Sequence, residues 1–479
     1  MTIRVALVIE DEYHYRNDLS GVLNFEQDEG FEYHIILPDR FSNRIVDCGQ
    51  KTVNFVHFSD KRKLFLFARE INRLSNRSRS SSFKFNHLRS YPPLLTLLRI
   101  KKRKHTQQKV KFGKLPSDQT VTLHRTIVNL NQIIFFLNRR IRLLLLGLAA
   151  IPIWSNLLVE LISKAIKEET LDDCILSIRP NVVIYVTSLF ESTSVSIARL
   201  CRRYGITYVL IADNWDNLCS KRTLWEKPDY VGVWGKQGKR HAREIHGYTN
   251  EQILEVGSPR LEPLLKFPIS KTSLKSSSQN LLLAGSSLVF DEIHLAEYLL
   301  TKLSEESVII NLVYRPYPWR HHEIPTKLLE HPRFSVDEAI KEQILNQVPS
   351  FDAKFNDYAH LLHNSHLVVG GLTTMILEAA LIGKPVVGIV YDDGSGSLNS
   401  PHLGYKNFEH FKGLENFPNI RLCHNKNDLW NLIKWGLDFV FNPNTLEFRE
   451  IQSEFYNVEK NRNFLQNLHQ NLRNLPLNG

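Results

Sequence analysis

Apolar positions along this chain fall into two alternating kinds of run. Short continuous runs of Val, Ile and Leu alternate with longer stretches in which apolar residues recur every three or four positions. The first pattern is typical of strands buried on both faces, and the second of helices with one apolar side. The alternation therefore predicts an α/β fold with parallel sheets covered by helices. The expected strands are residues 3–9, 33–37, 181–186, 207–211, 230–234, 253–256, 280–284, 308–313, 367–369 and 385–390.

The helical stretches lie between these strands, and the two series are separated by a Ser- and Thr-rich stretch at residues 271–279. Such a composition is typical of a linker. A chain of 479 residues is also too long for one hydrophobic core. We predict an N-terminal domain at 1–265, a C-terminal domain at 280–445 and a helical terminal segment at 446–479. The expected helices are residues 13–25, 193–204, 237–246, 293–303, 357–363, 374–382, 429–439 and 445–472.

Charge is distributed very unevenly along the chain. The whole chain carries +10, but residues 61–142 hold 21 Lys and Arg against two acids, a net +19 that leaves −9 elsewhere. This region lacks regular strand and helix alternation, so we predict a basic, mostly helical insertion at about 60–145 of the N-terminal domain. Apolar runs such as 133–136 adjoin the charges. Three interpretations stay open: an interface with anionic membrane, a site for a polyanion such as nucleic acid, and a solvated loop. The apolar admixture favours the membrane and disfavours nucleic acid.

Cysteine usage and hydropathy bear on the compartment. The five cysteines are far apart and form no Cys-x-x-Cys pair, which predicts neither a disulfide framework nor a zinc site. The longest apolar run, 143–154, contains Pro152 and follows Arg142, so it is too short for a spanning helix. The chain opens directly on a strand-like segment, and we expect no signal peptide. We predict a cytoplasmic protein, peripheral on the inner face of the cell membrane.

The most informative motif occupies residues 367–390. An apolar strand ends in Gly370 and Gly371, and a helix begins at Thr373 and Thr374. N–H groups at a helix N-terminus attract phosphate, and glycine lets a ligand approach the backbone. Glu378 lies one turn further on the same side, where a carboxylate accepts the two hydroxyls of a ribose. The motif predicts a nucleotide diphosphate site, against the alternative of a plain strand–turn–helix connection with Thr374 as its N-cap.

This stretch resembles the donor site of GT-B glycosyltransferases, in which a glycine-rich turn holds the nucleotide diphosphate and a Glu binds the ribose. The turn 257–260 (Gly-Ser-Pro-Arg) resembles a Gly-x-Pro-Arg turn of bacterial capsule and teichoic-acid transferases. The turn 315–318 resembles their Arg-Pro-His-Pro turn, with Tyr317 in place of His. The resemblance implies a GT-B fold: two Rossmann-like doubly wound domains that face a cleft, with 446–479 packing back on the N-terminal domain.

The resemblance also implies the remaining donor-binding residues. Gly285 and Ser286 follow the first strand of the C-terminal domain, where such enzymes contact the phosphates. Arg315 would neutralise the leaving diphosphate. No cofactor is implied, and no metal is expected, because the pairs His321/His322 and His360/His363 lack further ligands at a recognisable spacing. The expected donor-binding set is Gly285, Ser286, Arg315, Gly370, Gly371, Thr373, Thr374 and Glu378.

Candidates for catalysis lie in the N-terminal half, in segments that follow strands. His14 follows the first strand, and Asp213 and Asp216 follow the strand 207–211 beside Trp215. Since carboxyl ends of parallel strands face the ligand in α/β sheets, these side chains are candidates for the base that takes the acceptor's proton. The alternatives are a surface His and an Asx-rich turn. Glu191 and Ser192, after the strand 181–186, are similarly placed.

Together these observations predict a glycosyltransferase that moves a sugar from a nucleotide-sugar donor to a lipid-linked or polyanionic glycan acceptor in surface polysaccharide assembly. Two other enzymes remain open: a polyol-phosphate (glycerophosphate-type) transferase and a GT-B-type nucleotide-sugar epimerase. A non-enzymatic protein that uses its basic segment to bind membrane or nucleic acid is the alternative from another class.

Overall fold

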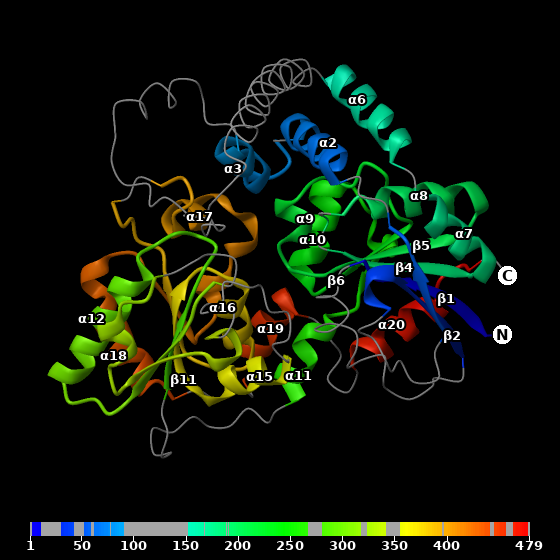
Figure 1. Ribbon diagram of the computed structural model, residues 1–479. Coiled ribbons are helices and arrows are strands. Elements are labelled where there is room, and N and C mark those ends of the chain that lie inside the picture. The colour runs from blue at the N-terminus through cyan, green and yellow to red at the C-terminus, as the bar shows by residue number, and fades with distance from the viewer. Residues whose placement is uncertain are drawn as a thin grey trace, which may run out of the picture.

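The computed structural model contains two parallel sheets, each flanked by helices (Figure 1). The first sheet has seven strands in the order β3-β2-β1-β4-β5-β6-β7, and the second has six in the order β10-β9-β8-β11-β12-β13. In both, the chain runs outward from the centre first in one direction and then in the other. This is the Rossmann-like doubly wound topology, and two such sheets give the GT-B architecture expected from the sequence. The structure describes residues 2–10, 30–42, 52–58, 62–76, 78–90, 152–166, 168–187, 189, 191–266, 280–317, 323–341, 355–394, 397–440, 445–456 and 463–477.

The strands are short, as in most α/β proteins. Those of the first sheet are β1 (Ile3–Val8), β2 (Phe31–Pro38), β3 (Thr52–Val56), β4 (Val182–Thr187), β5 (Thr207–Ala212), β6 (Tyr230–Val233) and β7 (Ile253–Glu255). Those of the second are β8 (Asn280–Ala284), β9 (Asn311–Arg315), β10 (Phe334–Val336), β11 (Ser365–Gly371), β12 (Val386–Ile389) and β13 (Ile420–Cys423).

The helices of the first half are α2 (Arg62–Ser75), α3 (Ser81–Ser90), α6 (Pro152–Ala165), α7 (Glu169–Ile178), α8 (Thr193–Tyr204), α9 (Asn217–Ser220), α10 (Lys236–His246) and α11 (Glu262–Lys266). Two of them, α2 and α3, lie within the basic insertion. The second half contains α12 (Glu292–Glu305), α13 (Thr326–Leu329), α15 (Phe355–Asn364), α16 (Thr374–Leu381), α17 (Pro401–Asn407), α18 (Leu429–Asp438), α19 (Leu446–Phe455) and α20 (Phe464–Arg473). The short 3₁₀ turns include η4 (Pro259–Leu261) and η5 (Glu409–Phe411).

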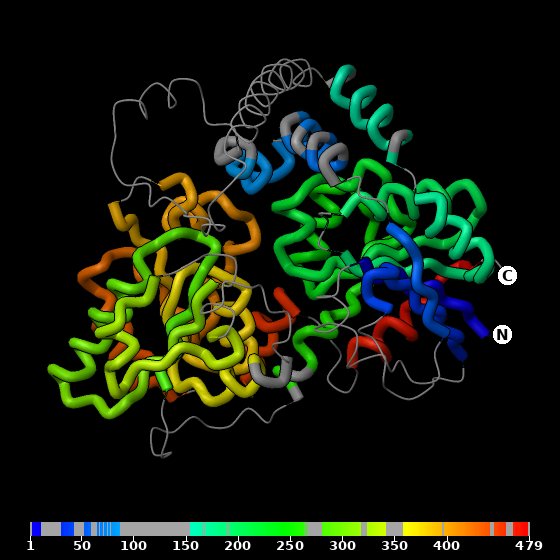
Figure 2. Tube along the Cα trace, in the orientation of Figure 1, coloured from blue at the N-terminus to red at the C-terminus, as the bar shows by residue number. Residues whose placement is uncertain are grey.

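Both sheets are buried on their two faces. In the first, alternate residues of β1 and β4 pack against α7 and α8 on one side and against α20 on the other. Phe464 and Leu468 of α20 lie in the same cluster as Val5 of β1 and Leu254 of β7, so the end of the chain packs on its beginning. The tube trace shows this directly, with red α20 beside blue β1 (Figure 2).

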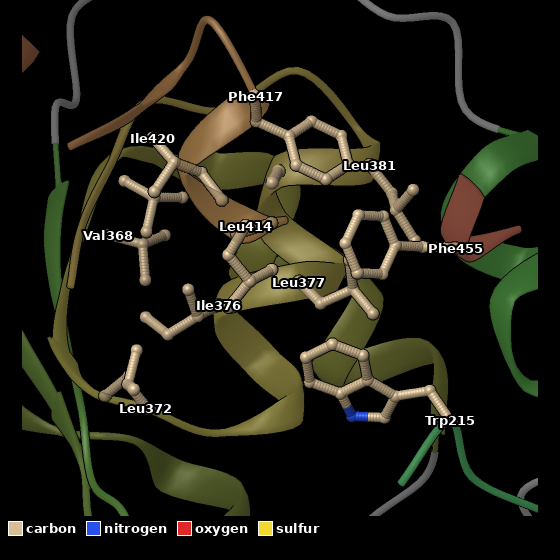
Figure 3. Close-up of a cluster of buried hydrophobic side chains, with 14 of the residues drawn as sticks. Trp215, Val368, Leu372, Ile376, Leu377, Leu381, Leu414, Phe417, Ile420 and Phe455 are labelled. Carbon is tan, nitrogen blue, oxygen red and sulfur yellow. The ribbon is translucent and has the colours of Figure 1, made fainter. Parts of the chain in front are cut away.

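The core of the second sheet receives a side chain from the first half of the chain. Trp215 follows β5, yet it belongs to the cluster built around α16 and β11. Figure 3 shows its indole beside Leu377 of α16 and below Phe455 of α19. The Trp215 ring makes edge contacts with His410 and Phe411 of η5, at centroid distances of 5.0 and 5.8 Å. The two halves therefore share apolar packing.

Several expectations lie outside the described residues. They are the helix at 13–25 with His14, the linker at 271–279, His321/His322, Cys48 and the greater part of the basic insertion. Cys174, Cys201, Cys219 and Cys423 are free thiols. Among the helices of the described segments, none is long and apolar enough to cross a membrane.

Candidate functional site

The strand order of the second sheet reverses between β8 and β11, the position where ligands bind in doubly wound sheets. The turns that follow these two strands lie against each other. The Ser286 hydroxyl, after β8, donates to the Leu372 carbonyl, after β11, at 2.8 Å. The two glycine-containing turns of the sequence motif are thus brought together at the switch point.

The glycines permit the close approach of these turns. A Cβ on Gly370 would lie 2.2 Å from the Ala284 carbonyl oxygen, and a Cβ on Gly285 would lie 2.4 Å from the Tyr317 nitrogen. The buried Ser286 donates its N–H to Oε1 of Glu292 at 3.1 Å. Gly285 donates its N–H to the Arg315 carbonyl at 2.8 Å. The N–H groups of Gly285 and Ser286 and the Ser286 hydroxyl are therefore bonded to protein, and in this conformation these residues support the turn after β11.

The first turn of α16 remains partly exposed at this edge. Thr373 precedes the helix in extended conformation, and its side chain does not cap the helix. Thr373 and Thr374 are partly exposed. Nδ2 of Asn214, which follows β5 of the first sheet, lies 3.3 Å from Oγ1 of Thr374 and donates to it. The carboxyl ends of β5 and β11 thus meet here, and the helix N-terminus offers N–H groups and hydroxyls suited to an anion.

Glu378 lies deeper in α16 and is 0% exposed. Oε1 of its carboxylate is 2.8 Å from Nη2 of Arg260, which belongs to η4 in the first half of the chain. Oε2 accepts a hydrogen bond from the Tyr358 hydroxyl of α15. Burial and the Glu378 charge raise the pKa of Tyr358 well above its usual value, so this phenol stays protonated and donates. In this conformation Glu378 binds two protein side chains where the sequence predicted a ribose.

Arg315 joins the same network from β9. Its guanidinium forms an ion pair with Asp337, directly after β10, and lies 4.9 Å from the centroid of the Tyr358 ring. Two guanidinium groups, those of Arg260 and Arg315, therefore converge around Tyr358 and Glu378. Sequence reasoning identified both arginines through their turns. It missed Tyr358 and Asp337, because no local motif marks either of them.

The first sheet reverses its strand order between β1 and β4, and two carboxylates lie at that point. Glu10, directly after β1, accepts a hydrogen bond from the Tyr185 hydroxyl of β4 at 2.8 Å. Glu191 follows β4 and accepts one from the Thr187 hydroxyl. Burial, followed by the negative charge of Glu191, raises the pKa of Glu10 to about 7. Glu191 was a candidate from sequence. Glu10 was missed, although an acid directly after the first strand is the signal that marks it.

The other predicted catalytic residues have different surroundings. Asp216 is 2.9 Å from Nζ of Lys221 and accepts from the Ser220 hydroxyl at 2.6 Å. Burial alone would raise its pKa, but the charges of Lys221 and His410 prevail and lower it to about 2. Such a carboxylate is a weak proton acceptor near neutral pH, and its contacts hold the loop before α9. Asp213 is buried and donates its N–H to the Thr187 carbonyl at 3.1 Å, and Ser192 is buried just before α8.

Metal ligands do not gather within the described residues: no group of three or more His, Cys, Asp or Glu side chains could hold an ion there. His363, one of the pairs noted in the sequence, lies with Nε2 2.8 Å from the Leu264 carbonyl. The contact connects α15 to α11, and it gives this histidine a structural role between the two halves.

Comparison with known proteins finds similarity to solved structures, and no match in sequence. No family model matches the chain, and no curated protein matches it in sequence. A UDP-GlcNAc 2-epimerase from Methanocaldococcus jannaschii is similar over 94% of this chain and 98% of its own, at 12% identity and a TM-score of 0.45. The calicheamicin glycosyltransferase CalG4 is similar over 99% of each chain, at 10% identity and a TM-score of 0.41. The glycosyltransferase VinC, solved with dTDP, is similar over 98% of this chain and 99% of its own, at 11% identity and a TM-score of 0.42. At these values the functional argument depends on the residues of the site itself.

Proposed function

We propose that this protein is a glycosyltransferase that moves a sugar from a nucleotide-sugar donor to a lipid-linked or polyanionic glycan acceptor during surface polysaccharide assembly, at the cytoplasmic face of the membrane. The observation that carries the proposal is the meeting of the two sheets at the N-terminus of α16, where Asn214 contacts Thr374. There a partly exposed helix N-terminus with two Thr hydroxyls faces the carboxyl edge of a second Rossmann-like sheet.

The donor's diphosphate would lie on the first turn of α16, bound by the N–H groups of that turn and by the hydroxyls of Thr373 and Thr374. Arg315, whose guanidinium lies over the Tyr358 ring, would balance the negative charge of the diphosphate. The ribose would be bound by Glu378. Because Glu378 is buried against Arg260, ribose can reach it only after that ion pair opens. Donor binding and a movement of η4 relative to α16 are therefore coupled in this proposal.

Glu10 is the proposed base, in place of the weakly basic Asp216. With a pKa of about 7, Glu10 is present both as the carboxylate and as the protonated acid near neutral pH, so it can accept a proton and release it again. In the reaction the acceptor hydroxyl would lose its proton to Glu10 as its oxygen bonds to the sugar's anomeric carbon. The bond from that carbon to the diphosphate breaks, and the diphosphate leaves with the electron pair. Glu191 keeps Glu10 basic through its charge.

An epimerase is the second candidate, and the same Glu10–Glu191 pair favours it. A carboxylate with a pKa of about 7 is suited to removing a proton from a sugar carbon as well as from a hydroxyl. Incubation with UDP-GlcNAc and no acceptor distinguishes the two reactions. An epimerase yields a second UDP-sugar, whereas a transferase leaves the donor intact apart from slow hydrolysis. A polyol-phosphate transferase would instead bind CDP in preference to other nucleotides.

The test of the proposed function is a thermal-shift screen with UDP, GDP, CMP, CDP and ADP. A nucleotide at 100 times its dissociation constant stabilises the folded protein by about 2.7 kcal/mol. We expect a shift with one nucleotide that is lost in Glu378→Ala and in Thr373→Val/Thr374→Val. Thr301→Val, on the far surface of α12, is the matched control and should keep the shift. A wild-type protein that melts cooperatively but shifts with none of the five would refute the nucleotide-sugar proposal.

A further inference from the structure

Helix α6 exposes an apolar face to solvent. Trp154, Leu157 and Leu161 are 50%, 44% and 54% exposed. Their spacing of three and four residues places them on the same side of the helix. A face of this kind is unfavourable in water unless something covers it.

The opposite side of α6 is firmly attached to the protein. Val159 and Ile71 of α2 pack in one cluster. The buried Ser163 accepts a hydrogen bond from Nε1 of Trp225 at 2.9 Å, and its carbonyl accepts one from Arg199 at 2.7 Å. The exposure of Trp154, Leu157 and Leu161 therefore belongs to a helix held in place, and it is not the result of fraying.

This face is also distinct from other exposed apolar residues. Within the segments that the structure describes, no other helix or strand carries more than one of the large exposed hydrophobics. Only α6 gathers three of them. In Figure 1 it lies with α2 and α3 at one end of the molecule, away from β11 and α16.

The charge of the sequence that precedes α6 indicates the kind of partner. Residues 61–142, which include α2 and α3 and end shortly before α6, carry 21 Lys and Arg against two acids. Arg139, Arg140 and Arg142 immediately precede the apolar run that leads into this helix. A protein partner with an apolar patch would not require such an excess of cations. An anionic bilayer would, because cations bind its headgroups while Trp and Leu side chains enter the boundary below them.

We propose that α6 docks this protein on an anionic membrane, with Trp154, Leu157 and Leu161 inserted between the lipid headgroups. The inference extends the proposed function, because a lipid-linked acceptor would lie in the same bilayer. It is nevertheless independent of nucleotide binding, which takes place on other elements. A failure of one proposal is therefore distinguishable from a failure of the other.

The test is co-sedimentation of the full chain with vesicles of phosphatidylcholine alone or with about 30% phosphatidylglycerol. Trp154→Ser/Leu157→Ser/Leu161→Ser is the variant, and Leu161→Gln is a milder second one. The matched control is Ile309→Ser/Val440→Ser/Leu446→Ser, which removes three exposed apolar side chains at scattered places. All variants are checked for an unchanged melting temperature and an unchanged nucleotide shift.

We expect the wild type and the control to bind anionic vesicles, and binding to weaken as salt rises from about 0.1 to about 0.5 M. The triple variant should bind at least about tenfold more weakly, and Leu161→Gln should lie between the two. Equal binding by the triple variant, or no preference for the anionic vesicles, would overturn the inference. So would a concentration-dependent dimer of the wild type that the triple variant abolishes, since α6 would then contact a second copy.

Discussion

At the scale of single residues, the protonation of Glu10 links the site to stability. The folded protein holds this proton up to about pH 7, whereas the unfolded chain releases it near 4.5. Stability contributed by the protonated form is therefore lost as pH rises between these values, by at most about 3 kcal/mol. The buried His241, His246 and His410 have lowered pKa values and therefore add stability as pH rises from about 5 to about 6.5, so the Glu10 contribution is read as a difference between two proteins. Urea unfolding at about pH 5 and about pH 8 should show a less favourable change in stability with rising pH in the wild type than in Glu10→Gln.

Glu32→Gln is the control, because it removes a carboxylate elsewhere on the protein. Glu32 has its pKa lowered by a hydrogen bond from Arg4 and one from His34. It is therefore ionised in both folded and unfolded chains above about pH 5, and Glu32→Gln should leave the pH dependence in this range unchanged. If Glu10→Gln keeps the full wild-type dependence, the proton is not held at Glu10.

The ion pair between Arg260 and Glu378 leads to a second prediction at this scale. Removing one partner leaves a buried charge unpaired, which costs about 3–5 kcal/mol. We therefore expect Glu378→Gln and Arg260→Gln each to be strongly destabilising in urea unfolding. The double variant should be little worse than either single one, because no lone charge remains. Additive losses would show that the two side chains do not interact across the halves of the chain.

The sequence predicted where the residues of the glycine motif lie, but it did not predict which side chains they contact. Gly370, Gly371 and the two threonines lie at the carboxyl end of β11 and the start of α16, as the strand–glycine–helix pattern predicted. The contacts of Glu378 could not be predicted, because Arg260 is 118 positions away and Tyr358 is on another helix. The raised pKa of Glu10 likewise could not be predicted, because it depends on burial that only the folded chain provides.

At the scale of secondary-structure elements, strands with an apolar run were predictable and strands without one were not. Expected and observed elements agree closely at α8 and β5, where apolar runs are continuous and Gly205 ends the helix with a positive φ of 68°. The edge strands β3, β10 and β13 were not predicted, whereas the fourth edge strand, β7, was expected at 253–256. These three missed strands are partly exposed, so they carry polar residues such as Asn54, Ser335 and Arg421 and show no continuous apolar run. The stretch expected as one helix at 445–472 contains two, α19 and α20.

The packing of the two turns at the switch point can be tested at this scale. In Gly370→Ala the new methyl would meet the Ala284 carbonyl oxygen at 2.2 Å, and backbone on a central strand cannot move aside easily. We expect a loss of at least about 3 kcal/mol in the free energy of unfolding, with a loss of nucleotide binding.

The control is Gly404→Ala in α17, where the new methyl meets the end of the Leu288 side chain. That side chain can rotate, and alanine favours the helix, so this variant should stay within about 1 kcal/mol of wild type. Similar losses in both variants would mean that the tight contact after β8 is not what requires glycine at 370.

At the scale of the whole molecule, the two halves form one interlocked body through several contacts. Trp215 enters the second core, Gln237 of α10 donates to the His410 carbonyl at 3.2 Å, and α20 returns to the first sheet. The proposed chemistry depends on this arrangement, because the base and the helix that binds the diphosphate come from different sheets. A two-domain protein with a large apolar interface is expected to unfold as one unit.

Trp215 contributes to the apolar part of that interface together with Phe85, Trp234, Leu261 and Leu264 of the first half, and it permits a test. Trp215→Ala removes contacts with His410, Phe411 and Phe455, at a cost of about 3–5 kcal/mol. Because the loss falls between the halves, we expect differential scanning calorimetry to show one transition in the wild type and two in the variant, with the nucleotide shift confined to one of them. Trp154→Ala, which removes an exposed indole from α6, should keep a single transition at the wild-type temperature. A single, uniformly lowered transition in Trp215→Ala would mean that the halves remain coupled through their other contacts, such as the Arg260–Glu378 pair and the hydrogen bond from Gln237 to His410.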